Sequence, residues 1–330
     1  MIRFTSLFSQ SQPHKLALAL TALLLSTIAS LFIGVIELDL DRLFTDPDGL
    51  WLMLVSRIPR TLAVLLTGVS LAIAGQVMQV LVQNRFVEPA TAGSGQSALL
   101  GIVLVTLYLP DSSLMTKMGL ASLAALLGTV VFLLMVHKLP RHDTYLVPLV
   151  GIVYGGVVGA AATWLAWQFD LIQMLGIWMT GEFSGVMRGR YDFLWIAGVL
   201  AIFSYLLADQ FTIASLGEDH ARNLGLNYNI VLVIGLLIIS VVMAVTVVTV
   251  GIIPFIGLIV PNIVSRWRGD NLRDSLPLVA YLGAMLTLLS DIIGRLVIFP
   301  YEIPVGSVFG VAGALVTLWL LYHSPSAQRN

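Results

Sequence analysis

The sequence predicts an all-α polytopic membrane protein, and three observations lead to that fold class. Hydrophobic residues make up 58% of the 330 residues and charged residues only 11%, whereas ordinary soluble domains carry about 25% charged residues. The mean hydropathy is +0.95. Long uncharged runs also recur from one end of the chain to the other. So few charges cannot cover a water-facing surface, and the composition therefore excludes a soluble enzyme, a disordered chain and a fibre.

The elements follow from the uncharged runs, because a membrane-spanning helix needs about 20 mostly apolar residues. In order along the chain, the runs are 16–36, 61–84, 89–110, 118–136, 144–169, 193–208, 223–265, 275–290 and 303–322. The first run is longer than the apolar core of a secretory signal, and no A-x-A-like cleavage site follows it. We therefore expect it to remain in the protein as the first spanning helix.

The run 223–265 is 43 residues long, which is too long for one crossing. It contains the sequence Gly251-Ile252-Ile253-Pro254, and proline interrupts a helix because it lacks an N–H and its ring clashes with the preceding turn. The sequence therefore predicts a break here and ten transmembrane helices in total.

Ten crossings place both termini on the same side, and the basic residues indicate which side that is. With the N-terminus inside, the inner segments hold Arg3, Lys15, Arg85, Lys138, Arg141, Arg222, Arg266, Arg268, Arg273 and Arg329. The outer segments hold Arg42, Arg57, Arg60, Lys117, Arg188, Arg190 and Arg295. This bias favours cytoplasmic termini. The segment 171–180 is apolar but too short to cross, so it predicts an interfacial or re-entrant helix on the outer face.

Several function classes find no support in the sequence. There is no cysteine, which excludes a disulfide framework and cysteine-based metal sites. The motifs G-x-x-x-x-G-K-[ST], H-E-x-x-H and G-x-S-x-G do not occur, and we predict no catalytic residues and no metal site. The net charge of −1 gives no basic surface for nucleic acid. The centres of the runs carry no charge, which argues against an ion-coupled secondary transporter and favours a permease driven from outside the membrane.

Two features leave alternatives open. The glycines of the run 144–169, among them Gly151, Gly155 and Gly156, indicate either close helix packing or a wide path lined by small residues. The inner segment at about 210–227 has a helix-like polar and apolar pattern. It is either an ordinary amphipathic connector or a short helix that docks on a cytoplasmic partner.

Four motifs, in the same order as in a known family, carry a resemblance that covers the chain from about Arg57 onward. They are Arg57-Ile58-Pro59-Arg60-Thr61-Leu62, Leu216 to Leu226, Gly251 to Asn262, and Glu302-Ile303-Pro304-Val305-Gly306. In these motifs the chain resembles the FecCD-type permease subunits of ABC importers, which carry ferric siderophores, haem and vitamin B12. The resemblance implies one transmembrane permease domain over 1–330 with the fold of the vitamin B12 importer, a type II ABC importer permease.

Two departures from the family pattern point to a branch within it. The family commonly has Asn-Pro-Leu-Ala-x-Pro after the second helix, whereas residues 84–89 read Asn-Arg-Phe-Val-Glu-Pro. Asn262 stands where the family usually has histidine. Both variants resemble the ferric-siderophore permeases.

The resemblance also implies roles for individual residues. The residues implied for the inner translocation gate are Asn84 and Phe86, with Asp143 and Thr144 in a second gate loop. The residues implied to dock on the ATPase are Gly217, Glu218, Ala221, Arg222 and Gly225. The residues implied to bind acidic residues of a substrate-binding protein are Arg57, Arg60 and Arg295. An alternative for Arg295 is an i,i+4 pair with Asp291, and both roles can hold together.

The implied function is ATP-driven import of a ferric siderophore across the bacterial inner membrane by alternating access. Haem and vitamin B12 remain alternatives, and an ion-coupled secondary transporter is a weaker one. The implied partners are a second permease subunit (identical or a paralogue), two cytoplasmic ATPase subunits and a periplasmic or lipid-anchored binding protein, besides membrane lipid. The chain itself needs no cofactor, because ATP and Mg bind the ATPase.

Overall fold

The computed structural model describes residues 13–34, 47–139, 146–189 and 191–322, and every regular element in these ranges is helical. The helices are α1 (Pro13–Phe32), α3 (Pro47–Leu52), the π-helical turn Met53–Arg57, α4 (Ile58–Val82), α5 (Ser94–Tyr108), α6 (Leu114–His137), α7 (Leu146–Gln168), α8 (Ile172–Met179), α9 (Leu194–Leu206), α10 (Ala208–Ala214), α11 (Glu218–Asn223), α12 (Tyr228–Val250), α13 (Ile256–Arg268), α14 (Leu272–Leu296) and α15 (Val305–Tyr322). The 3-10 turn Tyr191–Phe193 leads into α9. The all-α prediction is confirmed.

Each of the ten predicted segments contains a helix, but the helices differ in length. Within the described residues, five stretches are long and apolar enough to cross a membrane individually: Gly49–Val82, Leu114–His137, Leu146–Gln168, Tyr228–Val250 and Leu272–Leu296. The helices α9 and α10 form a sixth candidate that bends by 66° between them. The remaining predicted segments correspond to the shorter apolar helices α1, α5 and α15 and to α13.

The predicted break in the longest run is confirmed. α12 ends at Val250, and α13 begins at Ile256. At 1.5 Å per residue the 13 residues of α13 extend about 20 Å, which is less than the roughly 30 Å thickness of the hydrocarbon core. The short helix α8, predicted as interfacial or re-entrant, supports this break, because Ile252 N donates to Trp178 O at its end (3.0 Å).

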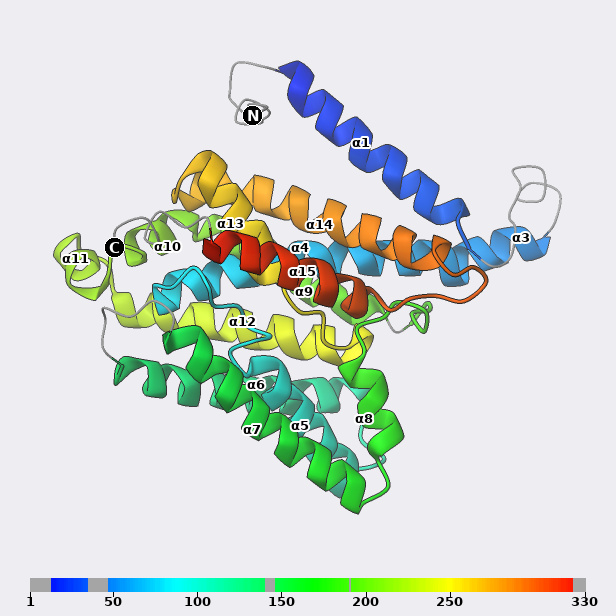
Figure 1. Ribbon diagram of the computed structural model, residues 1–330, viewed down its shortest axis with the longest axis horizontal. Coiled ribbons are helices and arrows are strands. Elements are labelled where there is room, and N and C mark those ends of the chain that lie inside the picture. Colours follow the sequence, from blue (N-terminus) through cyan, green and yellow to red (C-terminus); the bar gives the residue numbers. More distant parts are fainter. Residues whose placement is uncertain (1–12, 35–46, 140–145, 190, 323–330) are drawn as a thin grey trace.

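α4 is the central helix, and α9, α12, α13 and α14 pack around it (Figure 1). Its backbone approaches two neighbours where glycines face each other. A Cβ on Gly68 would lie 2.4 Å from the carbonyl oxygen of Gly283 in α14, and one on Gly75 would lie 2.1 Å from that of Gly257 in α13. Small residues at these crossings allow the close packing that holds membrane helices together.

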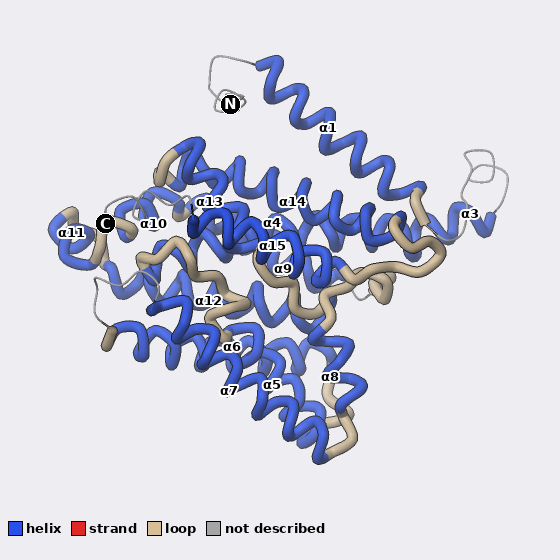
Figure 2. Tube along the Cα trace, in the orientation of Figure 1, coloured by secondary structure: helices blue, strands red, loops and turns tan. Residues whose placement is uncertain are grey.

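α5, α6 and α7 form a second group beside α12, whereas α1 lies on the opposite side, near α14 (Figures 1 and 2). The packing interpretation of the α7 glycines is supported at two positions. Gly151 and Gly155 pack against the segment that leads into α5, where Thr91 O and Gly93 Cα lie 2.9 and 3.4 Å from the added Cβ positions. Gly156 has open space beside it.

Candidate functional site

The segment after α4, residues 83–88, is called the gate loop below. Gln83 ends α4 in the left-handed conformation (φ 53°), which turns the chain away from the helix axis. Asn84 is buried, and its side-chain oxygen accepts a hydrogen bond from Phe86 N (2.9 Å). Such a turn is a common use of asparagine, because its side chain replaces a backbone acceptor. The structure therefore brings the two predicted gate residues together in one tight turn. Asp143 and Thr144, the second predicted gate loop, lie outside the described residues.

The predicted coupling segment forms two short helices, α10 and α11, joined at Gly217. Gly217 has φ 99°, a conformation that is open almost only to glycine. Glu218 and Arg222 form an ion pair along the exposed side of α11 (2.6 Å), while Ala221 is buried.

Gly225 ends this segment with φ 81°. Its N–H donates to Arg222 O, and the N–H of Leu226 donates to Ala221 O. This pair of bonds is a Schellman cap, which satisfies the last carbonyls of a helix and favours glycine at the left-handed position.

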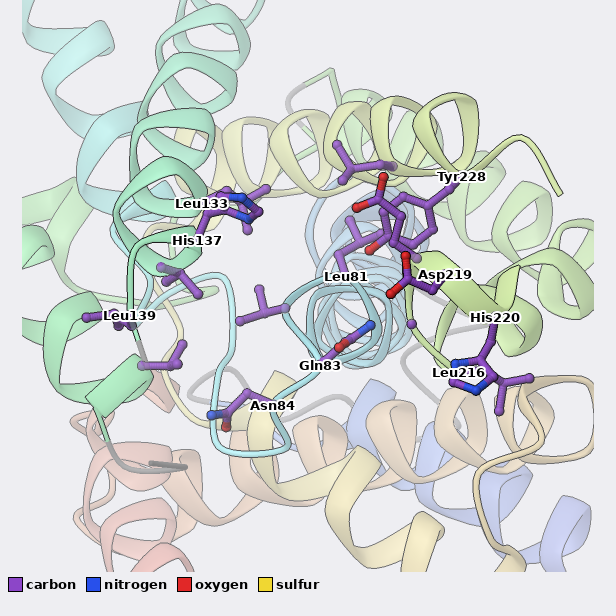
Figure 3. Close-up of a pocket in the computed structure, with 16 residues that line it drawn as sticks. Leu81, Gln83, Asn84, Leu133, His137, Leu139, Leu216, Asp219, His220 and Tyr228 are labelled. Atoms are coloured by element: carbon purple, nitrogen blue, oxygen red, sulfur yellow. The ribbon is translucent and has the colours of Figure 1, made fainter. Parts of the chain in front are cut away.

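Gate loop and coupling segment border one cavity of about 520 Å³. Figure 3 shows Gln83 and Asn84 between His137 and Leu139 on one side and Asp219 and His220 on the other. The lining is Leu81, Val82, Gln83, Asn84, Leu133, Val136, His137, Leu139, Val147, Leu216, Gly217, Glu218, Asp219, His220, Tyr228 and Leu232. Residues predicted for two different roles thus meet at the end of the molecule that holds α11.

The three predicted docking arginines lie together near the opposite end of α4, but they are turned into the protein. Arg57 and Arg295 are only 8% and 3% exposed. Arg57 donates to Ile33 O at the end of α1 (2.6 Å). Arg295 donates to Ser30 O (2.9 Å) and to Ser30 Oγ (2.6 Å).

Two carboxylates form ion pairs with Arg60 and Arg295. Asp291 has a fully buried side chain and forms ion pairs with Arg60 (2.8 Å) and Arg295 (2.6 Å), while Glu302 forms a further pair with Arg60 (2.8 Å). We call these five residues the arginine cluster. The i,i+4 pair expected for Arg295 is present. Arg60 and Arg295 form ion pairs within the chain and Arg57 donates to a backbone carbonyl, so the docking role of the three arginines remains a prediction.

The burial of two carboxylates was not predicted from the sequence. Asp291 lies inside α14, which extends beyond the predicted run, and Glu88 is only 1% exposed. The centres of the predicted runs carry no charge, as expected; these two buried carboxylates lie outside the runs, and each has partners in the chain. Glu88 occupies the variable position of the family's Asn-Pro-Leu-Ala-x-Pro pattern, so the pattern carried no signal for it.

Comparisons with known proteins agree on the kind of protein. The chain is 41% identical over 308 residues to the petrobactin import system permease protein YclN of Bacillus subtilis, covering 93% of this chain and 98% of that protein. It is 38% identical over 299 residues to the ferric-anguibactin transport system permease protein FatD of Vibrio anguillarum (90% and 95% covered). It is 33% identical over 303 residues to the vitamin B12 import system permease protein BtuC of Vibrio cholerae (89% and 91% covered).

The fold is also known from a solved structure. A metal-chelate type ABC transporter in an inward-facing conformation superposes with a TM-score of 0.79 at 23% identity, over 95% of this chain and 100% of that one. At this identity the likeness shows the fold alone. The sequence model of the FecCD transport family matches residues 22–323, and the chain therefore belongs to that family.

Proposed function

We propose that the chain is the permease subunit of an ATP-driven importer that carries a ferric siderophore across the bacterial cytoplasmic membrane. It is not an enzyme, because hydrolysis belongs to a separate ATPase subunit, to which ATP and Mg bind. The observation that carries this proposal is the shared cavity. A segment suited to receive a partner and a loop suited to close a path border the same space.

The proposed mechanism is alternating access. When the ATPase subunits close on ATP, they displace the coupling segment at α10 and α11. The gate loop lies against this segment, since Gln83 contacts Gly217, and it follows the displacement. The path runs between two permease subunits, identical or paralogous, and the open side of α7 at Gly156 is a candidate lining. We also propose a second-gate role for Asp143 and Thr144, which rests on the resemblance to the family.

The proposed substrate class rests on the sequence identity between the chain and its relatives. The petrobactin and anguibactin permeases are 36–41% identical to the chain, whereas the vitamin B12 permeases are 33–35% identical. Haem and vitamin B12 are therefore the weaker alternatives. Uptake of radio-iron-labelled ferric petrobactin by the reconstituted complex tests the proposal. ATP-dependent uptake that excess vitamin B12 does not inhibit is the expected result. Uptake that an ionophore abolishes, but a hydrolysis-deficient ATPase does not, would support a secondary transporter.

Both termini face the cytoplasm in this proposal, and the substrate-binding protein approaches from the opposite side. The chain contains no cysteine, so single introduced cysteines report topology directly. A cysteine at Ser113 should react with an impermeant thiol reagent in intact cells, and one at Asn271 only after permeabilisation. Labelling of the Asn271 position in intact cells would contradict this orientation.

A further inference from the structure

Two hydrogen bonds connect the gate loop to α13, which is far away in the sequence. Glu88 Oε1 accepts from Phe255 N (2.7 Å), and Asn262 Nδ2 donates to Arg85 O (2.7 Å). Glu88 and Asn262 are both at least nine-tenths buried. Asn262 is also a position at which the chain departs from the family pattern, and the two bonds hold the gate loop against the beginning and the middle of α13.

Glu88 occupies the N-terminus of α13. Besides Phe255 N, the N–H groups of Gly257 and Leu258 face its carboxylate. The first N–H groups of a helix have no partner within the helix, and the helix dipole favours negative charge there. The glycine allows the close approach, since a Cβ on Gly257 would lie 3.3 Å from Glu88 Oε2. Glu88 thus caps α13 from another part of the chain.

The residue that starts α13 is held in an unfavourable conformation. Phe255 has φ 69°, a left-handed value that is rare for a residue with a bulky side chain. Such conformations persist only where the surroundings fix them. Here Glu88 fixes the backbone N–H, and α15 fixes the side chain, because a Cβ on Gly313 would lie 2.4 Å from Phe255 Cβ.

The gate loop also contacts α13 further along that helix, toward the end of the molecule that holds α11. The amide of Asn262 donates both to Arg85 O and to Leu258 O of its own helix (2.7 Å each). Beyond it, Arg85 forms an exposed ion pair with Asp270 (2.5 Å). The gate loop therefore has polar contacts at Phe255, Asn262 and Asp270, which lie at the beginning, in the middle and just beyond the end of α13.

The far end of α13 reaches the coupling segment. After α13, the N–H of Leu272 donates to Thr212 Oγ1 in α10 (3.0 Å), and Arg273 pairs with Asp209 (3.5 Å). A displacement of α10 therefore acts on the turn between α13 and α14. This gives the coupling segment a second connection to the gate loop, in addition to the contact between Gln83 and Gly217.

We propose that Glu88 and Asn262 lock the gate loop onto α13, so that loop and helix move as one body when the gate opens and closes. Both are positioning residues: they hold Asn84 and Phe86 in place and do not touch the substrate. This inference rests on the proposed function and adds a mechanical element to it.

A reversible cross-link tests the rigid-body movement without weakening the lock. Arg85→Cys and Asp270→Cys introduce a pair that a short bis-methanethiosulfonate can bridge and a reductant can release. In the reconstituted complex, uptake of ferric petrobactin per ATP hydrolysed should be unchanged by this bridge. A matched bridge across the cavity, between Gln83→Cys and His137→Cys, should abolish uptake, and the reductant should restore it. Loss of uptake with the first bridge would overturn the inference.

Substitutions test the lock itself. Loss of a buried hydrogen-bond partner should shift the equilibrium between the docked and the free gate loop roughly 5- to 150-fold toward the free state. Complexes that carry Glu88→Ala or Asn262→Ala should therefore hydrolyse ATP with little uptake. Glu88→Gln should lower uptake less, because its side chain retains one acceptor. Asp111→Ala, in an exposed turn, is the control. Unchanged uptake per ATP in both alanine variants would contradict the lock.

The outcomes also separate the two proposals. If the parent complex shows no ATP-driven uptake at all, the proposed function is wrong and this inference with it. If the parent transports and the Arg85–Asp270 bridge stops it, the inference alone is wrong.

Discussion

The side chain of Gln83 lies against Gly217. Its Nε2 atom is 3.3 Å from the position that a Cβ on Gly217 would occupy. Gln83 is the left-handed residue that ends α4, and Gly217 precedes the first turn of α11. The contact joins the gate loop to the coupling segment across sequence positions that differ by more than a hundred. Any side chain added at position 217 must press on the gate loop.

Gly217→Ala should therefore impair coupling. The φ of 99° strains any residue with a side chain by about 1–3 kcal/mol, and the added methyl group displaces Gln83. We expect a lower ratio of uptake to ATP hydrolysis, measured in proteoliposomes. Gly119→Ala is the matched control, because that glycine lies in α6 with open space around it. Equal ratios for the two variants would show that the contact carries no coupling.

Two substitutions at Gly225 test the role of the cap that ends α11. A left-handed residue other than glycine costs about 1–2 kcal/mol, and asparagine tolerates this conformation better than other residues. Gly225→Val should break the Schellman cap of α11 and uncouple hydrolysis from uptake, whereas Gly225→Asn should retain most uptake. Since no atom lies within 4 Å of an added Cβ, a steric clash does not confuse the comparison. Identical behaviour of the two variants would contradict a role for the cap.

Phe86→Ala should loosen closure of the gate, because an aromatic side chain provides much of the contact area at a constriction. Phe86 is only half-buried, so the loss of unfolding free energy should be smaller than the about 3–5 kcal/mol of a fully buried phenylalanine. We expect leak of preloaded ferric petrobactin from proteoliposomes without ATP, or faster hydrolysis without uptake. Lower stability without leak would mean that Phe86 only packs against its neighbours.

The arginine cluster should contribute strongly to stability. Asp291→Asn leaves Arg60 and Arg295 short of their shared counter-ion in a buried site, and breaking a buried ion pair in this way costs about 3–5 kcal/mol. Asp209→Asn breaks an exposed pair with Arg273 and should cost at most about 1 kcal/mol. Thermal unfolding in detergent measures both. A small effect at Asp291 would show that the cluster is hydrated and weak.

The parts of this fold that sequence could predict are those fixed by neighbouring residues. Ten apolar segments and the break at Pro254 follow from local composition and from the missing N–H of proline. The gate turn at Asn84 and the glycine cap at Gly225 are also local. The partner of Glu88 and the contact of Arg295 with Ser30 were not predictable, since these groups lie 167 and 265 residues apart in the chain. Only the packing of the helices brings these groups together.

Docking of a binding protein on Arg57 can be tested against docking on Arg188, an exposed arginine nearby. Arg57 is buried and donates to Ile33 O, so an acidic partner residue must compete with contacts inside the chain. Arg188 is exposed, and its N–H donates to Val55 O close to Arg57. Charge pairs at the rim of an interface mainly set the association rate and its salt dependence.

If Arg57 pairs with an acidic residue of the binding protein, Arg57→Gln should slow association with the binding protein more than Arg188→Gln does. The difference should be largest at low ionic strength, where charges are least screened. Arg295→Gln should instead lower the unfolding temperature, because its guanidinium group connects α14 to α1 through Ser30. Surface plasmon resonance on nanodisc-embedded complexes measures the rates. A larger effect at Arg188 would move the docking site to the exposed arginine, because Arg57 already donates to a carbonyl inside the chain and is the less accessible of the two charges.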